Sequence, residues 1–240
     1  MGRYVLLMKR VFTRPDKWKI FFKQVVVEMD KLGINSISIV AIISLFIGAV
    51  ITIQTAYNLE NPLIPKYYVG LGARDTMLLE FSSTIVAIIL AGKVGSNITS
   101  EIGSMRITEQ IDAMEMMGVN SANYLILPKV VASVLFNPFL TIMSSILGIV
   151  GGAVIVIFTG VITLSDYVTG IQYAFIPFYL TYAVIKMAVF SVIITTVPAF
   201  YGYYAHGGSL DVGRASTNGI VSSSILILVF NLMLTQLLLT

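Results

Sequence analysis

The sequence predicts an all-α integral membrane protein with an N-terminal interfacial helix, five transmembrane helices and a cytoplasmic helix between spans two and three. Of its 240 residues, 57% are hydrophobic and 11% are charged, and the mean hydropathy is +0.90, well above soluble domains. Uncharged runs of bilayer-spanning length recur along the chain. They leave no segment large enough for a separate aqueous core, so we expect a single domain over residues 1–240.

Residues 1–31 form the first expected element, an interfacial amphipathic segment. They contain eight of the fifteen Lys and Arg residues, mixed with apolar side chains such as Trp18, Phe21 and Phe22. Basic side chains can meet phosphate head groups while aromatic ones enter the acyl boundary. A signal peptide is the alternative, but the basic region is long and no small-residue cleavage pattern follows the first apolar run.

Five apolar runs predict the spans. The first has 23 uncharged residues, about 35 Å of helix, which exceeds the roughly 30 Å hydrocarbon layer. An uncharged run of 33 residues in mid-chain is too long for one straight crossing, and we expect Asn137 and Pro138 to kink it and separate an oblique segment from the span. Gly148, Gly151 and Gly152 should let another helix approach closely. We place the spans at residues 34–56, 76–91, 138–162, 175–201 and 220–239.

The distribution of basic residues predicts a cytoplasmic N-terminus. This orientation puts twelve Lys and Arg residues in the cytoplasm, leaves Lys66 and Arg74 outside, and places Lys186 within a span, as the positive-inside rule requires. Five crossings then put residues 92–118 in the cytoplasm and the C-terminus outside. An odd number of spans also excludes a simple two-fold inverted repeat, which counts against a secondary transporter.

The polar stretch between spans two and three predicts an amphipathic helix over residues 101–118. On a helical projection Ile107, Ile111, Met114 and Gly118 share one face, and Ser104 is a possible N-cap. The other side is acidic, with Glu101, Glu109, Asp112 and Glu115. Such a helix suits a groove of a cytoplasmic protein. The alternative is a solvated helix that only connects two spans.

Two charged residues fall within the spans, Glu80 and Lys186. Each would cost several kcal/mol facing lipid, so we expect both to face protein or a wet cavity. They could contact a lipid head group or form a gating ion pair. Alternatively, Glu80 lies at the interface and Lys186 pairs with a carbonyl or carboxylate for structure alone. The single histidine, His206, has no neighbour at metal-ligand spacing and predicts no metal site.

Three stretches resemble the MlaE family of ABC-transporter permeases. AGKVGSNITSEIGSMRITEQIDAMEMMGVN, residues 91–120, resembles the family's AGRxGxxxxxExGxMxxTEQIDAxxxMGV. GGSLDVGRASTNGIVSSSILILVFNLMLTQLL, residues 207–238, is similar to the ending GGAxGVGRATTxxVVxSSxxxxxxDxxLTxL, and VIKMAVF, residues 184–190, to LIKSxVF. ARDTMLLEF, residues 73–81, lacks the proline of the family's RDLGPVL, and Asn231 stands where many members carry an aspartate.

The resemblance implies a permease subunit of an ATP-driven ABC transporter in the bacterial inner membrane. Such a subunit pairs as a homodimer, binds a cytoplasmic ABC ATPase, contacts a periplasmic MCE-domain protein and moves phospholipid. The chain has no G-x-x-x-x-G-K-[ST] loop, so ATP is expected on the ATPase, and no cofactor, catalytic residue, metal or nucleic acid is expected here. With an inside N-terminus, the C-terminus is periplasmic.

The resemblance also implies roles for individual residues. It assigns the contact with the ATPase to a coupling region that contains Glu101, Arg106, Glu109, Gln110 and Asp112. Candidate polar positions on the lipid path are Glu80, Lys186 and Asn231. Three alternatives stay open: an ion-coupled secondary carrier with Glu80 and Lys186 as its titrating pair, a membrane-embedded lipid-modifying enzyme, and an inert membrane anchor.

Overall fold

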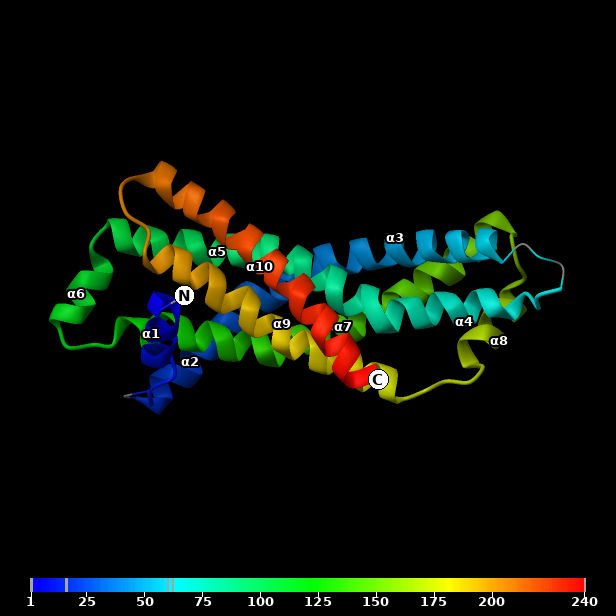
Figure 1. Cartoon of the computed structure of the whole chain (residues 1–240), viewed down its shortest axis with the longest axis horizontal. Coiled ribbons are helices and arrows are strands. Elements are labelled where there is room, and N and C mark those ends of the chain that lie inside the picture. Colours follow the sequence, from blue (N-terminus) through cyan, green and yellow to red (C-terminus); the bar gives the residue numbers. More distant parts are fainter. Residues whose placement is uncertain (1, 16, 60, 62, 240) are drawn as a thin grey trace. The chain divides into compact units, whose positions relative to one another are not determined.

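The computed structural model describes residues 2–15, 17–59, 61 and 63–239, and within these residues the chain contains helices and no strands. This confirms the all-α fold. The helices are numbered in chain order in Figure 1, and η1 and η2 are π-helices. Their bounds are α1 (Gly2–Val11), α2 (Trp18–Glu28), η1 (Met29–Ile34), α3 (Asn35–Asn58), α4 (Tyr67–Thr76), η2 (Met77–Ile85), α5 (Val86–Ile107), α6 (Gln110–Met116), α7 (Ser121–Thr159), α8 (Leu164–Gln172), α9 (Phe178–Tyr203) and α10 (Ser209–Leu239).

Within the described part of the chain, five continuous helical segments are long and apolar enough to cross a membrane, which agrees with the five expected spans. They are Trp18–Asn58, Tyr67–Ile107, Ser121–Thr159, Phe178–Tyr203 and Ser209–Leu239. Most extend beyond the apolar runs because helical hydrogen bonding continues into the polar flanks. The third ends earlier than expected, at Thr159, since Gly160 adopts a φ of +64°, the left-handed conformation that commonly ends a helix.

Two expected divisions of the chain can be compared with the structure. Residues 121–159 form one continuous helix that includes Asn137 and Pro138, and the kink expected there stays a prediction. The N-terminal segment, in contrast, is split: α1 is a separate helix, whereas α2 continues through η1 into the first span. Met1 and Asp16 of that segment lie outside the described residues.

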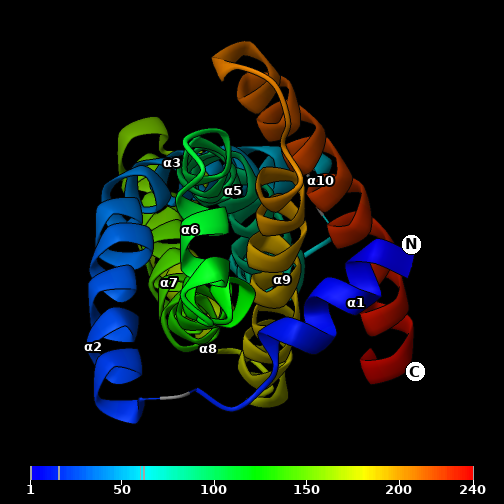
Figure 2. The ribbon, with the colours of Figure 1, turned by 90° about the vertical axis from the view of Figure 1, so that its left-hand side faces the viewer.

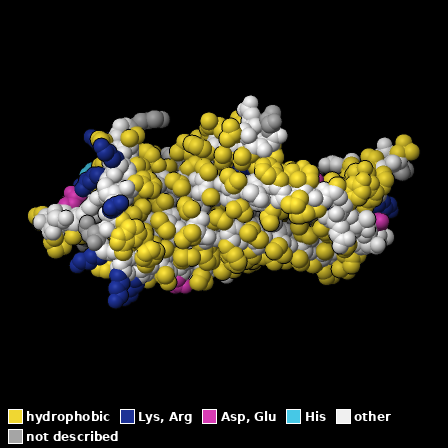
Figure 3. Space-filling view, turned by 90° about the horizontal axis from the view of Figure 1, so that it is seen from below, with side chains coloured by type: hydrophobic (Ala, Val, Ile, Leu, Met, Phe, Trp, Pro, Cys, Tyr) yellow, Lys and Arg dark blue, Asp and Glu magenta, His cyan; other side chains and the backbone are white. Residues whose placement is uncertain are grey.

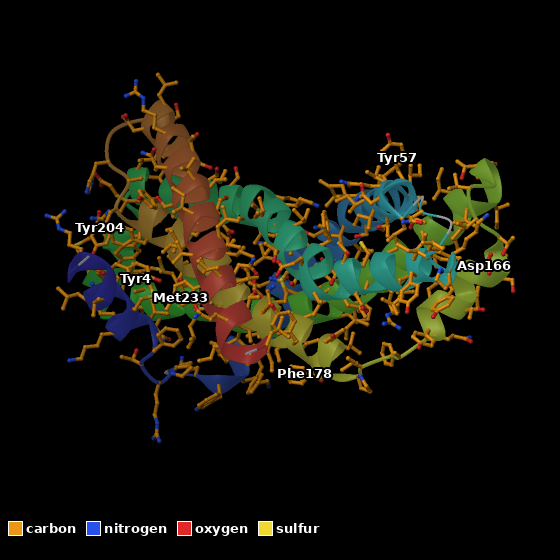
Figure 4. All side chains as sticks on the ribbon, turned by 45° about the vertical axis from the view of Figure 1, so that its right-hand side comes forward. Tyr4, Tyr57, Asp166, Phe178, Tyr204 and Met233 are labelled. Atoms are coloured by element: carbon orange, nitrogen blue, oxygen red, sulfur yellow. The ribbon has the colours of Figure 1, made fainter. Side chains whose placement is uncertain are left out.

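The chain divides into two compact units. Unit 1 comprises Met1–Ser36, Ala87–Asn137 and Ala188–Thr240. In this unit α1 packs beside α9 and α10 (Figure 2), and the Tyr4 and Thr196 hydroxyls lie 2.8 Å apart. The C-terminal part of α10 leaves large apolar side chains exposed, among them Leu232 and Met233, the latter labelled in Figure 4. An apolar helix surface of this kind suits lipid or another subunit.

Unit 2 comprises Ile37–Val86 and Pro138–Met187, and close contact of α3 with α7 determines its packing. A Cβ atom added at Gly48 would lie 1.9 Å from the Gly148 carbonyl oxygen, and one at Gly151 would lie 2.0 Å from the Leu45 oxygen. Gly152 faces the Thr52 hydroxyl in the same way. The expectation that these glycines admit a neighbouring helix is therefore confirmed.

A second close contact in unit 2 joins α4 to α8. A Cβ atom at Gly70 would lie 2.3 Å from the carbonyl oxygen of Tyr167. The buried Arg74 donates from Nη1 to the carbonyl oxygens of Ile171 (2.7 Å) and Tyr173 (2.8 Å). These acceptors lie at the C-terminal end of α8, where unpaired carbonyls and the helix dipole favour a cation. Helix α8 lies between the spans expected at residues 138–162 and 175–201, where no helix was expected.

The surface agrees with the composition. Figure 3 shows hydrophobic side chains over most of the face that it presents, with most of the Lys and Arg side chains at its left-hand end. Large exposed hydrophobic side chains occur on α3, α7, α9 and α10. Together with the five apolar segments, this surface identifies a multi-pass membrane protein.

The glycine contacts predict a large difference between two alanine substitutions. Gly151→Ala should lower the free energy of unfolding by about 1–3 kcal/mol, because the methyl group overlaps the α3 backbone. Gly92→Ala should be neutral or raise it by up to about 1 kcal/mol, since a Cβ atom there meets nothing within 4 Å. Titration of micelles with sodium dodecyl sulfate, followed by circular dichroism, measures both. Equal stability of the two variants would contradict the packing.

Candidate functional site

The polar stretch between the second and third spans forms a sharp turn and a short helix. Helix α5 continues to Ile107, and Glu109 then adopts φ +60° and ψ 12°, the left-handed region. Helix α6 follows and ends before Gly118, which has φ +76°. The single helix expected over residues 101–118 is therefore wrong, because a left-handed residue, unfavourable for all but glycine, interrupts it and no periodicity reveals that interruption.

Two further expectations about this stretch need correction. Ser104 lies inside α5, and the N-cap of α6 is Glu109, whose side chain makes no capping hydrogen bond. Ile111 is buried as expected, Ile107 and Met114 are half-buried, but Gly118 is exposed. The outer side of α6 is both acidic and apolar, since Met116 is 85% exposed and Met117 is 71% exposed.

Four of the five expected coupling residues surround this turn. Arg106 Nη1 donates to Asp112 Oδ1 at 2.6 Å, which closes the turn, and the Arg106 guanidinium lies 5.9 Å from the Tyr203 ring centroid. Gln110 Nε2 donates to the Thr108 hydroxyl at 3.0 Å. Glu109 and Gln110 are exposed. The turn thus presents charged and amide groups to any protein that approaches α6.

Glu101, the fifth residue, has intramolecular partners instead. Its Oε2 accepts from Lys129 Nζ at 2.6 Å, and its Oε1 lies 3.7 Å from Lys31 Nζ. The Lys129 side chain is only 3% exposed and also donates to Glu28 Oε1 at 2.8 Å. These contacts join α2, η1, α5 and α7 inside unit 1, so Glu101 belongs to an ionic cluster in which Lys129 and Glu28 are buried and Glu101 and Lys31 are partly exposed.

Glu115 is a site residue that sequence reasoning did not select. Its Oε1 accepts from Arg10 Nη2 (2.8 Å), the Tyr203 hydroxyl (2.8 Å) and the Ser121 hydroxyl (3.0 Å). The hydrogen bond from Tyr203, helped by those from Arg10 and Ser121, lowers the pKa of Glu115 against an opposing effect of burial. The hydrogen bond to Glu115 in turn raises the pKa of Arg10. One carboxylate therefore connects α6 with α1, α7 and α9.

Two asparagines of the same region hold the end of α1. Asn123 Nδ2 donates to the carbonyl oxygens of Val11 (2.7 Å) and Thr13 (2.8 Å), and Asn120 Nδ2 donates to that of Arg10 (3.0 Å). These bonds satisfy carbonyl groups that a helix end leaves without partners. The chain after α1 is thereby attached to the first turn of α7.

The two intramembrane charges form an ion pair within unit 2. Lys186, whose side chain is 0% exposed, donates from Nζ to Glu80 Oε1 at 3.1 Å. The same Nζ lies 3.1 Å from the Leu79 oxygen and from the Tyr182 hydroxyl, and 4.7 Å from the Tyr182 ring centroid. The expectation that Lys186 faces protein is confirmed. Glu80 lies in η2 and its side chain is 40% exposed, so the pair is buried at one end only.

Asn231, the remaining candidate for the lipid path, lies on α10 in unit 1 and is half-buried. The pair formed by Glu80 and Lys186 belongs to unit 2. Among the described residues no group of three or more His, Cys, Asp or Glu side chains could hold a metal ion.

Comparison with known proteins points to one family. A family model described as "Permease MlaE" matches residues 25–237. Relatives include a probable ABC transporter permease protein of Rickettsia bellii, 29% identical over 99% of this chain and 91% of its own length, and one of Synechocystis, 31% identical over 96% and 88%. The intermembrane phospholipid transport system permease protein MlaE of Haemophilus influenzae is 30% identical over 98% of this chain and 90% of its own.

The ion pair of unit 2 predicts an asymmetry between its partners. Glu80→Gln leaves the fully buried Lys186 ammonium without a carboxylate and should lower the free energy of unfolding by about 3–5 kcal/mol. Lys186→Met should lower the free energy of unfolding less, because the Glu80 side chain is 40% exposed and can be hydrated. The double variant should recover most of the loss. Detergent unfolding curves measure all three, and equal losses in the two single variants would overturn this account.

The Glu115 contacts predict that α1 detaches from α6 in acid. Because the folded-state pKa of Glu115 is lowered, its stabilising effect is complete above the ordinary carboxyl pKa of about 4.3. It is lost as the pH falls through the lower folded value. The chain has no cysteine, so spin labels at Lys9→Cys and Ala113→Cys report the distance between α1 and α6.

We expect a narrow distribution of this distance at pH 7. We expect a broad one only well below the ordinary carboxyl pKa of about 4.3, because the pKa of Glu115 is lowered. Arg10→Gln should broaden it already at pH 7, whereas Arg14→Gln, which alters an exposed arginine of the same segment, should match the parent protein. A narrow distribution in Arg10→Gln at pH 7 would show that Glu115 does not hold α1.

Proposed function

The chain belongs to the MlaE family of permeases, and we propose that it is the membrane subunit of an ATP-driven transporter that moves phospholipid between the bacterial inner membrane and a periplasmic MCE-domain protein. Family membership and the five apolar segments support a permease that is not itself an enzyme. The phospholipid cargo is proposed from the name of the Haemophilus influenzae relative. Family membership favours neither an ion-coupled carrier nor a lipid-modifying enzyme.

The observation that carries this proposal is the outer surface of α6. It combines exposed Met116 and Met117 with the acidic Glu109 and the Arg106–Asp112 pair at the turn. Flexible methionines and nearby charges suit a protein groove. An ABC ATPase bound there would supply the nucleotide site, because this chain has no phosphate-binding loop. With the N-terminus in the cytoplasm, α6 follows the second crossing and faces the ATPase.

Further features support the remaining partners. The exposed apolar side chains of α10 suit a second copy of the chain in a homodimer, or lipid. Glu80, the partly exposed member of the Glu80–Lys186 pair, and Asn231 are polar groups on candidate spans, where they can meet a phospholipid head group. A C-terminus on the periplasmic side follows from five crossings. Direct contact with the MCE-domain protein is proposed from the resemblance of the sequence motifs.

The docking surface is tested by charge substitutions in α6. The double variant Met116→Glu/Met117→Glu adds two negative charges to the acidic outer side, and the ABC ATPase that co-purifies from native membranes should fall at least about tenfold. Ser165→Glu, on the exposed side of α8 after the third span, should leave it unchanged. Quantitative mass spectrometry measures the ATPase, and phospholipid-stimulated ATP hydrolysis of the purified complex should fall in parallel. Full recovery of the ATPase with the double variant would contradict α6 as its dock.

A further inference from the structure

A pocket in unit 1 combines unpaired charge with an apolar wall. It lies between α2, η1, α5 and α7 and has a volume of about 490 Å³, within the range of about 300–1,000 Å³ that ligand pockets occupy. Figure 2 shows α2 alongside the start of α7. Apolar side chains, among them Ile20, Val27 and Leu125, line it together with five charged ones, Lys23, Glu28, Lys31, Glu101 and Lys129.

The charges in this pocket are not fully matched by the protein. Lys129 is used by two carboxylates, Glu28 and Glu101. The second oxygen of Glu28, Oε2, is buried and has no hydrogen-bond partner, and a buried acceptor without a donor is unfavourable. Lys23 has no ion-pair partner among the described residues and lies exposed at the pocket. The pocket therefore lacks one donor inside and one anion at its rim.

A single ligand that carries both a hydrogen-bond donor and an anion can supply what the pocket lacks. We propose that this pocket binds the head group of a zwitterionic aminophospholipid, with the phosphate at Lys23 and Lys31 and the primary ammonium at Glu28. The ammonium donates to the unpaired carboxylate oxygen after rotation of the Glu28 side chain. This inference rests on the proposed function, since it identifies the head-group class that the permease receives from the membrane.

The surroundings favour a lipid over a soluble phosphate ester. Phe22 and Val26 on α2 are exposed apolar side chains beside lining residues of the pocket, and the apolar wall can receive the upper part of an acyl chain. A ligand with negative charge only would meet the Lys31 and Lys23 ammonium groups but would leave Glu28 Oε2 without a donor and face the Glu101 carboxylate. The two carboxylates thus select for a positive group within the ligand.

The test measures lipid binding to the full-length chain in detergent by native mass spectrometry. Three lipids with the same acyl chains and different head groups serve as probes: phosphatidylethanolamine, phosphatidylcholine and phosphatidylglycerol. We expect phosphatidylethanolamine to bind at least about tenfold more tightly than phosphatidylcholine, because a site built around a donor discriminates against an analogue without one. Soluble glycerophosphoethanolamine should compete weakly; competition at equal concentration would show that the site takes the free ester and not the lipid.

Variants assign the two contacts. Glu28→Gln should abolish the preference for phosphatidylethanolamine over phosphatidylcholine. Lys23→Gln should weaken the binding of all three lipids to the same extent. Lys19→Gln, an exposed lysine of α2 that does not line the pocket, is the matched control and should bind as the parent does. Lys23→Gln keeps the test decisive if Glu28→Gln fails to fold. Equal binding of the three lipids to the parent, a preference that Glu28→Gln retains, or unchanged binding of all three lipids to Lys23→Gln would overturn the proposal.

The binding assay uses this chain without an ATPase, so its outcome is separate from that of the transporter proposal. If no ABC ATPase co-purified with the parent chain but head-group selection were intact, only the proposed function would be contradicted. Phospholipid-stimulated ATP hydrolysis that persists without any head-group selection would contradict only the pocket.

Discussion

The structure depends on the requirement that a cation removed from water must find carboxylates or carbonyl oxygens nearby. Three basic side chains are buried among the described residues: Arg74, Lys129 and Lys186. Each contacts acceptors from distant parts of the chain, namely the end of α8, the carboxylates of α2 and α5, and η2. An unpaired charge in an apolar interior is very unfavourable, so each cation restricts which helices can be neighbours. Apolar packing alone would allow many arrangements of the same helices.

The sequence predicts the helices better than their polar contacts, and the reason is physical. Apolar runs of span length identify the five membrane segments, and the glycine cluster of α7 correctly indicates a close helix contact. The left-handed Glu109 and the partners of Glu115 are not visible in that way. Arg10 and Tyr203 lie 105 and 88 residues from Glu115, so no local periodicity relates them. The start of helix α8 could have been predicted from Thr163 and Asp166, three residues apart. The Thr163 hydroxyl accepts from the Asp166 backbone N–H and donates to the Asp166 carboxylate, which forms an N-cap.

Glu101 shows that a residue of a family-like motif can also have partners within the chain. Its carboxylate lies against Lys129 and Lys31, and these contacts cannot be read from the motif. In the sequence Lys129 resembles a boundary marker, because it is a lone basic residue next to a long apolar run. The structure makes it the centre of a cluster of opposite charges. A charged residue next to an apolar run therefore deserves the same scrutiny as one inside a span.

The short helix α6 gains its position from the rest of unit 1. Seven residues are too few for a helix to be stable alone, and α6 has no side-chain cap. Burial of Ile111, the Arg106–Asp112 pair and the three hydrogen bonds to Glu115 fix it against α1, α7 and α9. A protein that displaces α6 must therefore break or move contacts on all three helices. This physical connection, and not the rigidity of α6 itself, would let the ATPase that we propose to dock there act on the membrane spans.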